Sequence, residues 1–338
     1  MSEKSLIQAR RLRREFTVAE GRAGLLGSIK SLFSSKSSVI HAVDDISFSI
    51  ESGEFVGYVG ENGAGKSTTI KMLTGILTPT SGQAMVDGIV PYEERVKNAF
   101  NIGVVFGQRS QLWWDLPVSD SFDLLRAIYR IPSQKYSANL AELSSWLELG
   151  PLMKMPVRKL SLGQRMRCDL AAALLHAPKV MFLDEPTIGL DIIAKDNVRR
   201  FLKKINQERG VTIILTTHDM DDIEALCNRI IIIDKGKIAW DGDTGRLKDE
   251  HMKGKILEVE FHGDDPGQVA LPGLSPFKRE ASKQWLRYSG DGGAGLNEVI
   301  SALFANYCVK DLSIHAPKVA DVVKAIYRQG EGRGEVGP

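Results

Sequence analysis

A short glycine-rich run constrains the fold of this chain more than any other feature. Its sequence is Gly60-Glu61-Asn62-Gly63-Ala64-Gly65-Lys66-Ser67-Thr68, which matches the phosphate-binding pattern G-x-x-x-x-G-K-[ST]. The apolar residues 55–59 before it have the character of a buried strand, and a helical pattern follows over 69–76. Strand, glycine loop and helix in this order are the context that the motif requires, which disfavours a chance glycine turn.

The residue types in this run predict a binding site for the phosphates of a nucleotide. Glycines let successive backbone N–H groups point into one concavity, which opens on a helix N-terminus and therefore favours anions. We expect Lys66 to reach the β- and γ-phosphates and Ser67 to hold Mg²⁺. On this motif alone, GTPases, kinases and helicases all remain possible.

A second acidic strand is expected to complete the magnesium site. It is the run Val180-Met181-Phe182-Leu183-Asp184-Glu185-Pro186, in which four apolar residues precede two carboxylates. Ligands bind at this carboxyl edge in open α/β sheets. Asp184 would hold Mg²⁺, directly or through water, and Glu185 would act as general base toward an attacking water. Such a strand by itself could equally end in a solvated acidic turn, but its pairing with the glycine loop favours the site.

Length, charge and cysteine content narrow the class of protein. A chain of 338 residues is expected to form two domains. Its 44 Lys and Arg against 42 Asp and Glu give a net charge of +2, which argues against a nucleic-acid partner. Three widely spaced cysteines imply neither a disulfide framework nor a zinc site and fit a reducing cytoplasm. Without a signal peptide or an apolar run near the ~20 residues of a membrane span, any membrane role is expected to be peripheral.

Apolar patterns elsewhere predict an α/β fold. Strands are expected at 42–50, 212–215 and 230–233, and helical periodicity dominates residues 118–149. This alternation indicates an α/β fold with a mainly parallel core sheet. Together with the glycine loop, we expect a P-loop NTPase that also has an antiparallel β part and a helical subdomain at about 109–160.

Changes in the pattern of apolar, polar and glycine residues along the chain give the expected domain boundaries. We expect a nucleotide-binding domain over 1–250, a small C-terminal α+β accessory domain over 251–329 and a disordered tail over 330–338. A Gly-, Ser- and Lys-rich surface insert is expected at 19–38. Its amphipathic part, residues 25–33, would lie on lipid, on a partner or, as the plainer alternative, on its own domain.

Further motifs share their order and spacing with those of the ABC-type ATPases. They are Leu160-Ser161-Leu162-Gly163-Gln164-Arg165, which resembles the family's signature L-S-G-G-Q; Gln108, at the position of its Q-loop; Gly189-Leu190-Asp191, which resembles its D-loop; and His218, which resembles its switch histidine. With the phosphate loop, the resemblance covers roughly residues 5–245.

This resemblance implies that ATP and Mg²⁺ are bound between two copies of the chain. In the family, two nucleotide-binding domains close head to tail, and each ATP lies between the phosphate loop of one copy and the signature of the other. Ser161 is expected to cap the following helix, so that its N-terminus faces the γ-phosphate. Gly163 and Gln164 would bind ATP beside it, and Asp191 would line the dimer seam. His218 would contact the γ-phosphate, and Gln108 would sense both the metal and the attacking water.

Two departures from the family pattern affect this expectation. Leu162 replaces the second-position glycine of the signature, and its side chain restricts the backbone there. The aromatic that stacks on adenine is Phe16 or His41, with Phe16 favoured by its strand register, although the 19–38 insert breaks the usual spacing.

The resemblance also implies a membrane partner. Trp113 and Trp114 follow Gln108 in the region where the family receives the coupling helix of a transmembrane permease, and at least one of them is expected to be subdomain core. Pro317–Tyr327 resembles the last helix of the C-terminal extension of drug and polysaccharide exporter ATPases. The expected function is a Mg²⁺-dependent ATPase subunit of an exporter, peripheral on the cytoplasmic face of the cell membrane. The alternative is a soluble ABC-type ATPase not coupled to transport. Residues 109–160 are too short for the coiled coil of a chromosome-maintenance head, and translation factors carry two cassettes.

Overall fold

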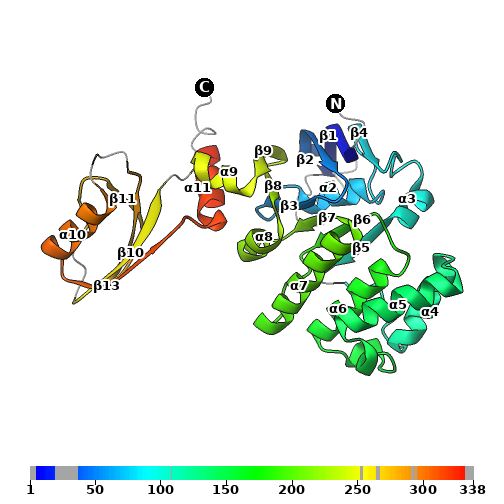
Figure 1. The fold of residues 1–338 in the computed structure, drawn as a ribbon. Coiled ribbons are helices and arrows are strands. Elements are labelled where there is room, and N and C mark those ends of the chain that lie inside the picture. Colours follow the sequence, from blue (N-terminus) through cyan, green and yellow to red (C-terminus); the bar gives the residue numbers. More distant parts are fainter. Residues whose placement is uncertain are drawn as a thin grey trace, which may run out of the picture. The chain divides into compact units, whose positions relative to one another are not determined.

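The chain divides into two compact units, residues 1–242 and 243–338. The computed structural model describes residues 5–19, 37–107, 109–251, 254–263, 267–290, 293 and 295–331. Figure 1 shows the helices and strands of both units. The expected insert falls almost entirely outside the described residues, since the first strand runs to Ala19 and the second begins at Ser37.

The first unit is built on two sheets. A six-stranded sheet has the order β5 (Ile102–Phe106), β6 (Val180–Asp184), β7 (Thr212–Thr216), β3 (Phe55–Gly60), β8 (Arg229–Asp234) and β9 (Lys237–Asp243), and its pairings from β5 to β8 are parallel. A three-stranded antiparallel sheet has the order β2 (Ser37–Glu51), β1 (Ser5–Ala19) and β4 (Ser81–Val86). Both sheets were expected, and together they confirm the predicted fold class.

Helices connect the strands and complete the first unit. They are α2 (Lys66–Leu73), α3 (Arg95–Asn101), α4 (Val118–Ile128), α5 (Ser133–Leu147), the short η1 (Gly150–Leu152) and η2 (Val157–Lys159), α6 (Leu162–Leu174), α7 (Ile192–Arg209) and α8 (Met220–Leu226). Helices α4 and α5 occupy the expected helical subdomain. Helix α6 packs against β5 of the core sheet, and α7 packs against both α6 and α8.

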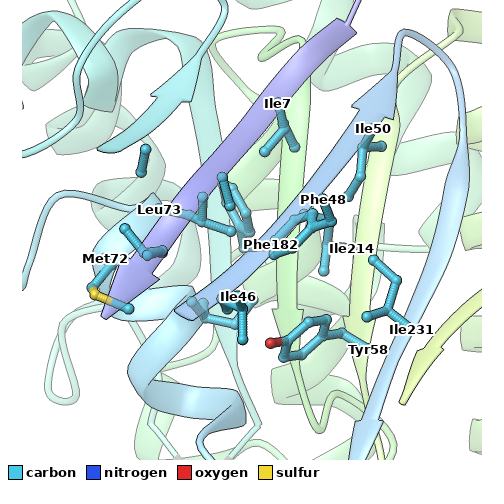
Figure 2. Close-up of a cluster of buried hydrophobic side chains, with 14 of the residues drawn as sticks. Ile7, Ile46, Phe48, Ile50, Tyr58, Met72, Leu73, Phe182, Ile214 and Ile231 are labelled. Atoms are coloured by element: carbon cyan, nitrogen blue, oxygen red, sulfur yellow. The ribbon is translucent and has the colours of Figure 1, made fainter. Parts of the chain in front are cut away.

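The core of the first unit lies between the two sheets. Figure 2 shows how apolar side chains from both sheets and from α2 meet there. Strand β2 supplies Ile46, Phe48 and Ile50 at alternate positions, because successive side chains of a strand point to opposite faces. They pack with Tyr58, Met72, Leu73, Phe182, Ile214 and Ile231. Burying each large apolar side chain of this layer stabilises the folded state by roughly 1.5–3 kcal/mol. This packing holds the start of α2 in place next to the phosphate loop.

In the residues that the structure describes, the second unit is a four-stranded antiparallel sheet with three helices. The sheet has the order β11 (Leu274–Glu280), β12 (Lys283–Tyr288), β10 (Lys255–Phe261) and β13 (Val309–His315). Helix α10 (Leu296–Asn306) covers one face through Leu303, while α9 (Thr244–His251) and α11 (Val319–Glu331) lie against each other. Residues 243–250 thus group with the second unit, although the sequence placed them in the first domain. Helix α11 continues through residue 331, where the tail was expected. The domain limits drawn from the sequence stay a prediction.

No helix in the described part of the chain is both long enough and apolar enough to cross a membrane. None of the three cysteines forms a disulfide in the described part of the chain, and Cys168 and Cys227 are buried whereas Cys308 is exposed.

Candidate functional site

The phosphate loop joins β3 to α2 and depends on glycine. Gly63 and Gly65 have φ of +85° and +107°, in the left-handed region that side chains rarely adopt. A Cβ at residue 65 would also collide with the carbonyl oxygen of Ala42 on β2. The loop therefore turns tightly against the antiparallel sheet and leads directly into α2 at Lys66. The expected strand, loop and helix are all present.

Lys66 lies folded over this loop. Its side chain is buried, with 7% of the residue exposed, and its Nζ donates to the carbonyl oxygens of Gly60 at 2.6 Å and Glu61 at 2.9 Å. Burial lowers the pKa of Lys66, and the negative charges of Glu185, Asp184 and Glu61 offset part of that effect. The loop thus encloses a partly desolvated cation, which suits a phosphate group.

Asp184 ends β6 next to the start of α2. Its Oδ2 accepts a hydrogen bond from the Ser67 hydroxyl at 3.3 Å, and its Oδ1 accepts one from the Thr216 hydroxyl on β7. A hydroxyl and a carboxylate at this separation are hard oxygen donors, and Mg²⁺ at nucleotide sites takes few protein ligands besides phosphate oxygens and water. The residues present therefore fit the magnesium ion expected from the sequence.

Glu185 adopts an unusual backbone conformation at the end of the same strand. Its φ is +54°, and its N–H donates to the Thr216 carbonyl at 2.9 Å. Non-glycine residues in this region carry strain and cluster at functional sites. The turn lets the carboxylate meet the next expected residue, His218, whose Nδ1 lies 3.2 Å from Glu185 Oε1. The expected general base and the expected switch histidine are thus in contact.

Gly107, the residue before Gln108, lies against the backbone of Glu185. The Gly107 N–H donates to the Asp184 carbonyl at 2.8 Å, and a Cβ at residue 107 would collide with the Glu185 carbonyl oxygen. Gln108 itself lies outside the described residues. Sequence reasoning missed Gly107, because its role depends on a contact with a residue distant in the chain.

The signature residues form the N-terminus of α6. The Ser161 hydroxyl accepts from the Gln164 N–H at 3.3 Å, and the Gln164 side chain accepts from the Ser161 N–H at 2.9 Å. This reciprocal capping box satisfies two otherwise unpaired donors. Leu162, the departure from the family pattern, is the first helical residue. Its Cδ2 is 3.0 Å from where a Cβ at Gly189 would stand, so this leucine packs over the glycine before Asp191.

A shallow pocket joins the signature to the expected D-loop. It has a volume of about 230 Å³, and its lining includes Ser161, Gly163, Gln164, Asp191 and Ala194. Asp191 caps α7 by accepting from the Ala194 N–H at 2.8 Å. The predicted residues therefore lie in two groups, one around the phosphate loop and one around the signature, linked by the turn 185–190.

A buried acid that the sequence did not single out connects three parts of the site. Asp222 on α8 is fully buried. It accepts from Thr187, in the turn after Glu185, at 2.5 Å and from Arg199 on α7 at 2.6 Å. It also accepts a hydrogen bond from the Thr217 hydroxyl at 3.4 Å, and Thr217 directly precedes His218 in the sequence. Only its position four residues after the histidine could have suggested it.

The two candidates for stacking on adenine lie on paired strands at the same end of the antiparallel sheet. Phe16 on β1 pairs with Ile40, and its ring lies 4.7 Å from the Arg14 guanidinium carbon. The neighbouring His41 on β2 lies 3.2 Å from Glu15 and directly precedes Ala42, which abuts Gly65.

The paired tryptophans are both on the surface. Trp113 is 38% exposed and Trp114 is 52% exposed, so the expectation that at least one is subdomain core is wrong. The physical reason is their position in a loop before α4, where Leu112 supplies the buried contact instead. Other exposed apolar side chains occur on α3 and α4, namely Val96, Phe100, Leu124 and Ile128.

Comparison with known proteins shows which family this chain resembles. Residues 43–188 match the family model described as ABC transporter. The chain is 33% identical to the ABC transporter ATP-binding protein NatA of Bacillus subtilis over 210 residues, which cover 62% of this chain and 85% of NatA. It is 34% identical to the methionine import ATP-binding protein MetN 2 of Enterococcus faecalis over 290 residues, covering 75% and 83%. A solved dimeric bacterial ABC transporter cassette, MJ0796, matches with a TM-score of 0.59 at 25% identity, over 70% of this chain and 98% of that one.

Proposed function

This chain belongs to the ABC transporter family as an ATP-binding subunit that hydrolyses ATP, and from that premise we propose that two copies of it power export through separate membrane-spanning subunits. The observation that carries the catalytic part of the proposal is the position of Glu185. Its carboxylate contacts His218, its backbone abuts Gly107, and it directly follows Asp184.

We assign a role to each side chain of the phosphate-loop group. Lys66 would exchange its two carbonyl acceptors for phosphate oxygens of ATP. The Ser67 hydroxyl and the Asp184 carboxylate would hold Mg²⁺, which neutralises charge on the phosphates when bound. Glu185 would take a proton from the attacking water, and His218 would keep the glutamate carboxylate oriented while contacting the γ-phosphate. Gln108 would sense metal and water from the segment beside Glu185.

The second copy of the chain would complete the site from the other side. Ser161, Gly163 and Gln164 present a helix N-terminus, which attracts the γ-phosphate of a facing nucleotide. Ile192 and Ile193, directly after Asp191, are 86% and 75% exposed, and two adjacent exposed isoleucines fit a surface that a second copy covers. Family members such as the MJ0796 cassette form dimers.

The proposed site of action is the cytoplasmic face of the cell membrane, with a permease seated on the exposed tryptophan surface. Export is supported by the resemblance of Pro317–Tyr327 to exporter extensions. Import is the second candidate, because the methionine import protein MetN 2 aligns with 75% of the chain. Transport assays in vesicles with the identified membrane partner separate the two directions.

Replacing Glu185 by glutamine tests the catalytic proposal. Glu185→Gln removes the base and keeps the side-chain size, so ATP hydrolysis should fall by about a hundredfold or more while ATP binding persists. An ATP-bound dimer should then accumulate, as measured by light scattering after size exclusion. The control is Glu142→Gln, which removes a carboxylate paired with Arg209 outside the site. Hydrolysis by Glu185→Gln at the parent rate would show that this glutamate is not the base.

A further inference from the structure

A buried carboxylate ties the signature helix to the segment that follows Gln108. Asp169 lies on α6 with 4% of the residue exposed. Its Oδ1 accepts from the Ser110 hydroxyl at 2.8 Å and from the Gln111 N–H at 3.1 Å. The Gln111 side-chain amide donates back to the Asp169 carbonyl oxygen at 2.9 Å. We call these three residues the tether.

The tether extends one helical turn toward the signature. The guanidinium carbon of Arg165 lies 5.5 Å from the centre of the Trp114 ring, within the range of a cation–π contact. Arg165 is four residues before Asp169, so both side chains lie on the same face of α6. The Ser110 hydroxyl also accepts from the Leu112 N–H at 3.1 Å, which keeps residues 110–112 in one conformation. The segment 110–114 is therefore held against α6 at two points, one at Asp169 and one at Arg165.

The tether connects three parts of the molecule whose movements must be coupled in the proposed function. The segment 110–114 begins three residues after Gly107, whose backbone lies against Glu185. It ends at Trp113 and Trp114, the surface proposed for the permease. Helix α6 begins at the Ser161 cap, which would face the nucleotide of the second copy. Hydrogen bonds between side chain and backbone on both partners leave little freedom for one element to move without the other.

Fold stability alone is a poor reason for an acid at this position. Arg165 on the same helix contacts Trp114 and offsets the burial of Asp169 only in part. Burying a carboxylate costs free energy that an apolar residue of similar size would not cost. What the carboxylate supplies is an acceptor for two donors of a distant segment, 58 and 59 residues earlier in the chain.

We propose that Asp169 is a positioning residue that makes α6 follow the segment 110–114 when ATP binds, so that Ser161 is oriented toward the nucleotide of the second copy. This inference rests on the proposed function. It assigns to Asp169 no contact with ATP.

Two substitutions at Asp169 separate the acceptor from the charge. Asp169→Asn keeps Oδ1 as an acceptor, whereas Asp169→Leu has similar size and no acceptor, which leaves the Ser110 hydroxyl and the Gln111 N–H unpaired. Both are measured in the full-length chain for MgATP affinity, kcat and KM, and in the Glu185→Gln background for ATP-dependent dimerisation. Asp169→Leu should keep the nucleotide affinity of the isolated copy but lose at least about tenfold in kcat and in dimerisation. Asp169→Asn should stay close to the parent on all measures.

The inference is overturned if Asp169→Leu dimerises and turns over like the parent, or if the asparagine and leucine variants lose activity equally. Should Asp169→Leu not fold, Ser110→Ala combined with Gln111→Ala decides, because these positions are only partly buried. The double alanine variant should have a lower kcat and an unchanged ATP affinity. An unaltered kcat would contradict the positioning role of Asp169. A parent chain without MgATP hydrolysis contradicts the proposed function instead, which distinguishes the two failures.

Discussion

Gly107 is the residue at which the site leaves least room for change. Its missing side chain lets the backbone before Gln108 approach the Glu185 carbonyl, and its own N–H donates to the Asp184 carbonyl. Glu185 is itself held in a left-handed conformation, so this contact fixes a strained residue from outside. The position of the proposed general base therefore depends on a residue that has no side-chain chemistry.

Adding one methyl group at Gly107 should disturb both stability and turnover. Gly107→Ala forces a backbone shift, since the obstacle is a main-chain oxygen, and overpacking of this kind costs roughly 1–3 kcal/mol. We expect a lower urea midpoint and a kcat reduced more than the ATP affinity. Gly150→Ala is the matched control, because no atom lies within 4 Å of the added Cβ. Equal behaviour of the two variants would contradict the proposed contact.

The free energy of unfolding should depend on pH through the titration of the Asp169 carboxyl. Burial raises its pKa from 3.8 to about 6, against the opposing effects of Ser110, Gln111 and Arg165. The folded carboxyl holds its proton more tightly than the unfolded one, so its contribution to stability is fully present below pH 3.8 and is lost as the pH rises toward 6. The loss amounts to at most about 3 kcal/mol. Urea unfolding of the parent and of Asp169→Asn should show the variant gaining relative stability from about pH 4 to pH 7, whereas parallel curves would contradict the raised pKa.

The helices and strands that the sequence predicts well are those whose pattern is local. Strand β6 was expected at 180–183 and runs to Asp184, because four consecutive buried side chains define it. The strands that were missed are β4, β5, β9 and β11, and each lies at the edge of its sheet. An edge strand pairs on one side only and can stay polar, as the exposed Ser81 and Gln83 of β4 illustrate.

Helix α6 offers a prediction at the scale of one element. Ser161→Ala removes the side-chain acceptor of the capping box, which typically costs about 1 kcal/mol of helix stability. Amide hydrogen exchange should speed up in the first turn of α6 and remain unchanged in α7, whose own cap is Asp191. Ser161→Asn retains an oxygen acceptor and should restore most of the protection. Unchanged exchange in Ser161→Ala would show that the cap does not stabilise this turn.

At the scale of the whole molecule, the phosphate loop, the acidic strand and the alternation of apolar strands with helices predicted the fold class. The first two motifs also predicted that Lys66, Ser67 and Asp184 lie together, as they do in the structure. The sequence could not predict the contacts made by Gly107, Asp169 and Asp222. These depend on segments that approach only after the sheets and the subdomain have packed. The same holds for the tryptophans, because their exposure is decided by the loop that carries them and not by their residue type.

The exposed tryptophans predict how the chain assembles with a permease. Trp113→Ala combined with Trp114→Ala removes large apolar side chains from the surface, and aromatic anchors often contribute more than 2 kcal/mol to an interface. Co-purification with the membrane subunits should weaken strongly, while the affinity for MgATP stays at the parent level. Val96→Ala on α3, which is 74% exposed, shows whether the contact extends beyond the loop. Undiminished co-purification of the double variant would place the permease elsewhere.

The folding of Lys66 onto its own loop has a consequence for which molecules can enter. An incoming ligand must displace the Gly60 and Glu61 carbonyls from the ammonium and compensate a cation that burial has already made less favourable. A triphosphate brings more negative charge to that exchange than a monophosphate or an uncharged nucleoside. We therefore expect the phosphate loop to discriminate among nucleotides by the length of their phosphate chain, independently of the base.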